Sequence, residues 1–100
     1  METYKIQEGV VLVEIQSVPL LVADASAMRY CPYVLQTNEL GAFIWRLLEQ
    51  GFDFSDIVSA VIKEYEVEEP HIAEADIQSF IQKLTNSHYL ILEKKEVHEK

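Results

Sequence analysis

The hydrophobic periodicity of this chain changes once, and that change constrains the fold more than any other feature of the sequence. Up to about Gln36, the apolar residues form short alternating runs rich in β-branched side chains, which is the spacing of half-buried strands. From there to about Ser87 they recur every three or four residues, which is the spacing of amphipathic helices. The sequence therefore predicts an α+β domain in which a three-stranded antiparallel sheet is followed by three helices.

The first expected strand, residues 10–16, is amphipathic. Its alternation places three β-branched side chains on one face and two polar ones on the other: Val11, Val13 and Ile15 against Glu14 and Gln16. A small sheet built from such strands has to bury one of its faces on the helices that follow.

Turn signals separate the next two strands. Residues 17–19, Ser-Val-Pro, interrupt the first strand, and residues 20–23 resume extended structure so soon afterwards that the two are expected to pair as a hairpin. A loop of small residues, 24–32, comes next. Residues 33–36 form a short third strand, with Pro32 at its start, where a missing backbone N–H is tolerated. The expected three-stranded meander has two edges.

The first expected helix begins at Glu39. Asn38 caps it by accepting a hydrogen bond from a free N–H group of the first turn, and Gly51 stands where a left-handed C-terminal cap is wanted. Trp45 lies one residue out of phase with the main apolar stripe. It is therefore expected either to flank the core or to contact a partner.

Two more helices follow, each with an apolar stripe. The second is capped by Asp53 or Ser55 and ends near Glu66. The third begins at Pro70, a residue suited to a first helical turn, and ends at residues 86–87. Each stripe is expected to face the sheet.

The C-terminal part is an apolar segment followed by a charged tail. Residues 89–92 are expected to pack under the helices as a strand or as coil, and residues 93–100 to fray. A chain of 100 residues has enough apolar surface for one compact core. We therefore expect a single domain over residues 1–100, with an ordered core at about 5–92.

Charge and composition exclude several classes of partner. Lys and Arg number 8 against 17 Asp and Glu, for a formal charge of −9. The resulting field repels polyanions, so neither nucleic acid nor membrane is expected as a partner. The start of the chain lacks the pattern of a signal peptide, and a single cysteine cannot close an internal disulfide. The expected location is cytoplasmic.

Candidate catalytic or metal-binding groups are few and isolated. His71, His88 and His98 have no partner at metal-ligand spacing. Cys31 lacks a second cysteine or a neighbouring base, and the acidic residues between 64 and 76 lack the spacing of a calcium loop. The sequence predicts neither enzymatic activity nor a metal or other cofactor.

In order and spacing, these features resemble the PqqD family. Residues 34–45, VLQTNELGAFIW, are similar to the family's junction between strand and first helix. Residues 57–69 resemble its second helix and the linker after it, residues 75–84 its third helix, and residues 89–91 its closing segment. The resemblance extends over about residues 10–92.

Members of that family are small winged-helix-like domains. They bind the leader segment of a ribosomally made precursor peptide and present it to a modifying enzyme, often a radical S-adenosylmethionine protein. The resemblance implies that an extended leader adds a strand to the open edge of the third strand and places side chains in a groove against the third helix. The peptide-binding residues that it implies are Tyr33, Val34, Leu35 and Gln36 on the strand and Asp76, Ile77, Phe80, Lys83 and Leu84 on the helix.

Two alternative functions remain open. A winged-helix DNA-binding regulator would need a basic third helix, whereas Lys83 is the only lysine or arginine between Pro70 and Ser87. An interaction subunit that packs on a partner enzyme would use the strand edge for dimerisation. Under the peptide-binding hypothesis the protein is expected to be a monomer or a weak dimer.

Overall fold

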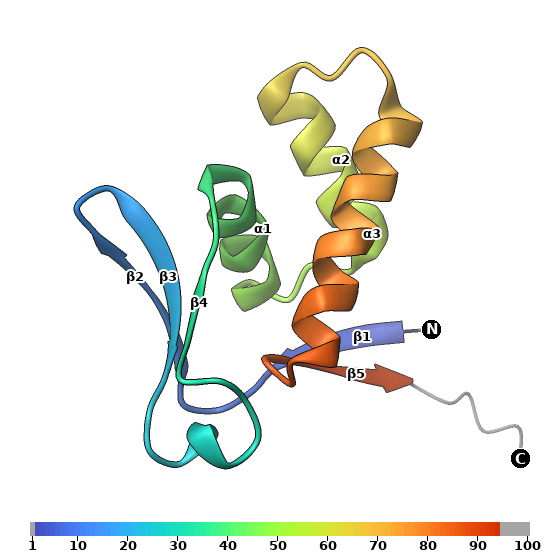
Figure 1. Cartoon of the computed structure of the whole chain (residues 1–100). Coiled ribbons are helices and arrows are strands. Elements are labelled where there is room, and N and C mark those ends of the chain that lie inside the picture. Colours follow the sequence, from blue (N-terminus) through green and yellow to red (C-terminus); the bar gives the residue numbers. More distant parts are fainter. Residues whose placement is uncertain (1, 95–100) are drawn as a thin grey trace, which may run out of the picture.

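The computed structural model of the protein describes residues 2–94, and Figure 1 shows their arrangement. The predicted α+β architecture, with a three-stranded antiparallel sheet ahead of three helices, is confirmed. The elements in chain order are β1 (Glu2–Ile6), β2 (Val10–Ile15), β3 (Val18–Ala23), a 3₁₀ turn (Ala27–Arg29), β4 (Val34–Gln36), α1 (Glu39–Glu49), α2 (Phe54–Tyr65), α3 (Pro70–Asn86) and β5 (Leu90–Lys94).

The strands β2, β3 and β4 form the predicted meander, with β3 in the centre. Leu21 of β3 stands opposite both Leu12 of β2 and Leu35 of β4. Leu21 is fully buried, and its two neighbours pack against the same core. The inner face of the sheet is therefore a row of leucines.

The apolar face of β2 found in the sequence is the outer face of this sheet. Val11 and Ile15 are 53% and 56% exposed, whereas Val10 and Leu12 point toward the core. Because side chains alternate along a strand, the register that buries Leu12 beside Leu21 turns Val11, Val13 and Ile15 outward.

The hairpin between β2 and β3 turns earlier than the sequence indicated. Its loop is Gln16-Ser17, both in the left-handed region with φ of 52° and 67°, as in the two-residue turns that match strand twist. Pro19 therefore lies inside β3. Thr37 N donates to Pro19 O (3.0 Å) just beyond the end of β4. Pro19 therefore stands at the end of the pairing between β3 and β4, where the lack of a backbone N–H is tolerated.

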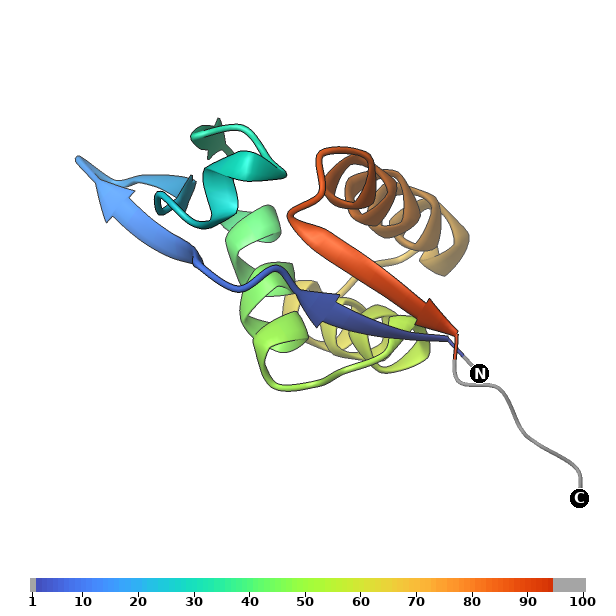
Figure 2. The ribbon, with the colours of Figure 1, turned by 90° about the horizontal axis from the view of Figure 1, so that it is seen from below.

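A second, two-stranded sheet joins the ends of the described chain. The antiparallel pair β1 and β5 runs beneath the helices (Figure 2). The sequence did not indicate β1. The segment after α3, which was expected to be either a strand or coil, forms the strand β5. Residues 93 and 94 belong to β5 rather than to a frayed tail, and residues 95–100 lie outside the described part.

Local capping groups set the helix boundaries. Asn38 Oδ1 accepts from Gly41 N at 2.8 Å, and Asp53, rather than Ser55, caps α2 by accepting from Asp56 N at 2.9 Å. α1 is followed by Gly51 at φ +89°, and α2 ends in the left-handed Glu66. The predicted starts and ends of all three helices are confirmed to within a residue.

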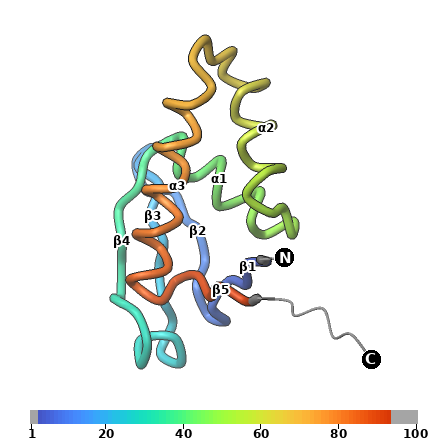
Figure 3. Tube along the Cα trace, turned by 90° about the vertical axis from the view of Figure 1, so that its right-hand side faces the viewer, coloured from blue at the N-terminus to red at the C-terminus, as the bar shows by residue number. Residues whose placement is uncertain are grey.

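One core joins the inner sheet face to the helices. Trp45 is fully buried, and its Nε1 donates to Glu49 Oε2 at 3.2 Å, so it belongs to the core and does not contact a partner. Ile44, Ile57 and Tyr89 are equally inaccessible and come from α1, α2 and the segment after α3. The helices cover the inner face of this sheet, and Figure 3, turned by 90° from Figure 1, shows α3 in front of β3 and β4.

Candidate functional site

The site begins with the open edge of β4. Ala23 N donates to Tyr33 O (2.8 Å) and Thr37 N to Pro19 O, so residues 33 and 37 direct these backbone groups toward β3. Backbone groups alternate in direction along a strand, so the N–H and C=O groups of Val34 and Gln36 point away from β3. Within residues 2–94, no strand pairs with β4 on that side.

One end of this edge is held to the end of α3 by a single hydrogen bond. Tyr89 Oη donates to Pro32 O at 2.7 Å, joining residues 57 positions apart. Tyr89 is fully buried, and its burial, followed by the charge of nearby Cys31, raises the pKa of the phenol above its usual value. The phenol therefore stays protonated and able to donate throughout the physiological range.

At its other end, the edge is close to the middle of α3. A Cβ on Gly41 would lie 3.1 Å from Phe80 Cζ and would also collide with Thr37 Oγ1, so the absence of a side chain at position 41 lets the Phe80 ring approach α1. A cavity of about 220 Å³ opens there between the start of α1 and α3, and it is lined by Asn38, Leu40, Gly41, Ile44, Asp76 and Phe80.

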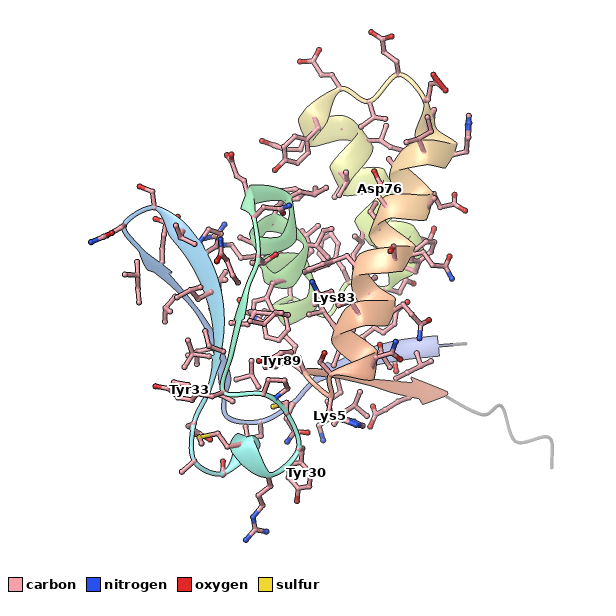
Figure 4. All side chains as sticks on the ribbon, in the orientation of Figure 1. Lys5, Tyr30, Tyr33, Asp76, Lys83 and Tyr89 are labelled. Atoms are coloured by element: carbon pink, nitrogen blue, oxygen red, sulfur yellow. The ribbon has the colours of Figure 1, made fainter. Side chains whose placement is uncertain are left out.

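These contacts define a groove, which we call the β4–α3 groove. It comprises the free edge of β4, the cavity that Asp76 and Phe80 line, and the part of α3 from which Lys83 extends (Figure 4), and the Tyr89–Pro32 contact lies at one end. A second cavity, of about 250 Å³ and lined mainly by apolar side chains of α1, α2 and α3, shares Leu40 and Asp76 with the first. The groove thus continues into an apolar pocket.

The structure brings together most of the residues predicted to bind a peptide. Tyr33 (61% exposed), Val34 (45%) and Gln36 are accessible, and Leu35 packs its side chain toward the core. On α3, Asp76 and Lys83 are exposed and Phe80 is half-buried.

Two of the predicted helix residues do not belong to the groove surface. Ile77 and Leu84 have no exposed area, because they lie on the side of α3 that packs into the core. They support the groove from below and cannot touch a peptide in this structure. In the sequence, the apolar stripe of α3 does not indicate on which side of the stripe the helix is exposed.

Sequence reasoning missed Tyr89 and Gly41 as parts of the site. The sequence placed Tyr89 in an apolar closing segment and indicated no role for Gly41, because their partners Pro32 and Phe80 are distant in the chain. The placement of Gly41, three residues into a helix that a glycine weakens, was the one local signal.

The loop that leads into β4 is anchored by Asp24. Its Oδ1 accepts from Ser26 Oγ (2.7 Å), Ser26 N (2.9 Å) and Ala27 N (3.0 Å). The Ser26 hydroxyl, and then the Ala27 amide, lower the pKa of the Asp24 carboxyl. Cys31, in the same loop, is buried with its Sγ 3.1 Å from Ala27 O, and burial raises the pKa of its thiol. These contacts fix the conformation of the loop that precedes β4.

Metal-ligating side chains do not gather in the part of the chain that the structure describes. Among residues 2–94, no three histidine, cysteine or carboxylate side chains are placed to hold an ion. His71 lies 3.8 Å from Glu69 on an exposed surface, away from the groove. No described helix is both long and apolar enough to cross a bilayer.

The fold and the groove define a class of protein: a small α+β domain whose sheet edge lies open along a helix. The chain belongs to the PqqD family, because the model of that family, described as coenzyme PQQ synthesis protein D, matches residues 9–90. No curated protein sequence matches the chain.

Two solved structures share the fold. One, described as TbiB1 in complex with the TbiA(beta) leader peptide, is 29% identical, with a TM-score of 0.71 over 87% of this chain and 94% of that chain. The other, a lasso peptide synthetase B1 complexed with the leader peptide, is 22% identical, also with a TM-score of 0.71, over 88% of this chain and 96% of that chain.

Proposed function

We propose that this protein is a single non-catalytic domain that binds the leader segment of a ribosomally synthesised precursor peptide and presents it to a modifying enzyme. One observation carries the proposal: the outward backbone groups of Val34 and Gln36 lie open beside α3. Membership of the PqqD family supports it, and so does the likeness to TbiB1, which was solved with a leader peptide.

An extended peptide fits this site because β4 offers it a strand's hydrogen-bonding pattern. Val34 and Gln36 each present one donor and one acceptor, so an antiparallel strand can form up to four backbone hydrogen bonds with β4. These bonds are independent of sequence, and they hold the peptide main chain at the mouth of the groove.

Selectivity comes from alternate side chains of the added strand. Those on its inner side face the groove, where Phe80 and the cavity beside Gly41 accept apolar groups. Side chains on its outer side extend the exposed outer face of the sheet, which includes Val11 and Val34. A strand bound in this way keeps the rest of the precursor free to reach an enzyme.

The groove contains no pair of side chains suited to covalent chemistry. Its charged groups include Asp76 and Lys83, and Cys31 is buried within the loop that precedes β4, with its thiol directed at a backbone carbonyl. We therefore assign the chemistry to the partner enzyme, whose type the residues of this chain do not specify. Ribosomal precursors are made in the cytoplasm, so the proposed encounter takes place there.

The test is a titration of isotope-labelled protein with the leader peptides encoded near its gene. We expect amide shifts concentrated along residues 33–36 and on the groove face of α3, around Phe80. Shifts confined to β2, or to the sheet of β1 and β5, would contradict strand addition at β4. A peptide of the same composition in scrambled order is the control, and it should leave these amides unmoved.

A DNA-binding regulator remains a testable alternative, but no observation favours it. The exposed side chains of α3 include Glu74 and Asp76 as well as Lys83, so the helix presents no basic surface to a phosphate backbone. A shift of duplex DNA at low salt, with no response to any leader peptide, would support that alternative.

A further inference from the structure

We infer that the β4–α3 groove selects its peptide by the order of charges: the side chains that enter it run basic, apolar, acidic from the N-terminus at alternate positions. This inference rests on the proposed function, because it requires a peptide strand on β4. It adds a specificity that backbone hydrogen bonds alone do not provide.

Three residues on one face of α3 provide the charges and the apolar contact of the groove. Asp76, Phe80 and Lys83 are spaced by four and by three, so they lie within one narrow arc of the helix. Asp76 and Lys83 are two turns apart, about 10 Å along the axis. The face therefore reads negative, aromatic, positive, whereas Ile77 and Leu84 on the adjoining arc belong to the core.

The two charges stand at different heights along β4. Asp76 lines the cavity with Asn38 and Gly41, at the end where β4 leads into α1. Lys83 lies two turns further along α3, on the way to the Tyr89–Pro32 contact at the opposite end of β4, and Figure 4 shows it reaching from α3 toward the sheet. The groove is thus negative near the C-terminal end of β4 and positive nearer its N-terminal end.

Neither charge is neutralised by an ion pair within the described chain. Over residues 3–93, no lysine or arginine lies within ion-pair distance of a carboxylate, and the contact between His71 and Glu69 at the start of α3 does not involve the groove. Glu39, exposed in the first turn of α1 beside Asn38, adds negative charge at the Asp76 end. Both ends of the groove therefore remain available to an opposite charge on a ligand.

The direction of the peptide follows from the sheet. β3 pairs with β4 antiparallel, and we infer the same direction for the added strand, because antiparallel pairing is the more stable of the two. It passes Asp76 first, then Phe80, then Lys83. Along the peptide, side chains at positions i, i+2 and i+4 span about 13 Å, whereas Asp76 and Lys83 are about 10 Å apart along α3. The flexible side chain of Lys83 can span this difference.

A random peptide library of fixed length, displayed and selected on the purified protein, tests the inference. We expect enriched peptides to carry Lys or Arg, an apolar residue and Asp or Glu at alternate positions in that order. The variant Asp76→Lys with Lys83→Asp keeps the net charge and should enrich the reverse order. For one synthetic peptide, the double reversal should weaken binding about tenfold at low salt, and less at high salt.

A matched control places the same charges on the far side of α3. Gln78→Lys with Gln82→Asp changes exposed residues that line a separate cavity and should leave the selected charge order unchanged. The inference is refuted if the native protein and the groove variant select peptides without a charge order, or with the same one. Failure of the proposed function is a different result: selected peptides would leave the amides of residues 33–36 unshifted.

Discussion

Replacing Gln36 by proline separates strand addition from other ways of binding a peptide. The Gln36 N–H points away from β3, so Gln36→Pro removes an outward donor and keeps the bonds that hold β4 in the sheet. The proline ring also occupies the place where the peptide carbonyl must approach. The Gln36 side chain is exposed, so little packing is lost.

The expected loss follows from one broken backbone contact. A peptide carbonyl left without its donor at a closed interface costs about 1–3 kcal/mol, which corresponds to a dissociation constant about 5- to 150-fold higher. The free energy of unfolding should change much less, because an edge strand tolerates proline where the N–H faces solvent. The two quantities therefore separate a binding defect from a folding defect.

Fluorescence anisotropy with a labelled leader peptide measures the binding, and urea unfolding measures the stability. Glu14→Pro is the matched control: Glu14 is exposed and opposite Pro19, and its N–H points outward at the other edge of the same sheet. It should cost similar stability and leave binding intact. Equal binding by Gln36→Pro and the native protein would refute strand addition at β4.

Three further predictions concern the groove's supports. Tyr89→Phe leaves Pro32 O without its donor and should lower the free energy of unfolding, measured in urea, by about 1 kcal/mol. Because the folded-state pKa of Tyr89 is raised, the native protein should also lose stability as pH rises above 10, and the variant should lose less. The Asp24 carboxylate has a lowered pKa in the folded protein, so its contribution to the free energy of unfolding is present above pH 3.8 and is lost as pH falls through the folded-state pKa. Asp24→Asn should therefore flatten that part of the acid unfolding curve. The buried Cys31 thiol, with its raised pKa, should react with a thiol reagent only as fast as the protein unfolds, and rapid labelling in the native state would contradict this placement.

Helix positions were predictable because their signals are local. Asn38, Asp53 and Pro70 each act within one helical turn, and the structure places all three at the starts that the sequence indicated. The third strand was predictable for the same reason, whereas its open edge was implied by the family resemblance. Its short apolar run stands between a proline and a helix cap.

The features that the sequence did not reveal depend on distant pairing. β1 is short and acquires its partner only in β5, at the other end of the described chain. The burial of Leu12 rather than Val11 depends on the register with Leu21, which no local pattern specifies. Likewise, the division of α3 between core and groove depends on where the sheet lies, so the sequence did not reveal that Ile77 and Leu84 are buried.

Amide hydrogen exchange at Val34 and Gln36, measured with and without bound leader peptide, is a direct test of strand addition at β4. We expect fast exchange at both amides in the free protein and strong protection in the complex. Leu35, whose position faces β3, should exchange slowly in both states. Exchange at Val34 and Gln36 that stays fast in a saturated complex would contradict the account.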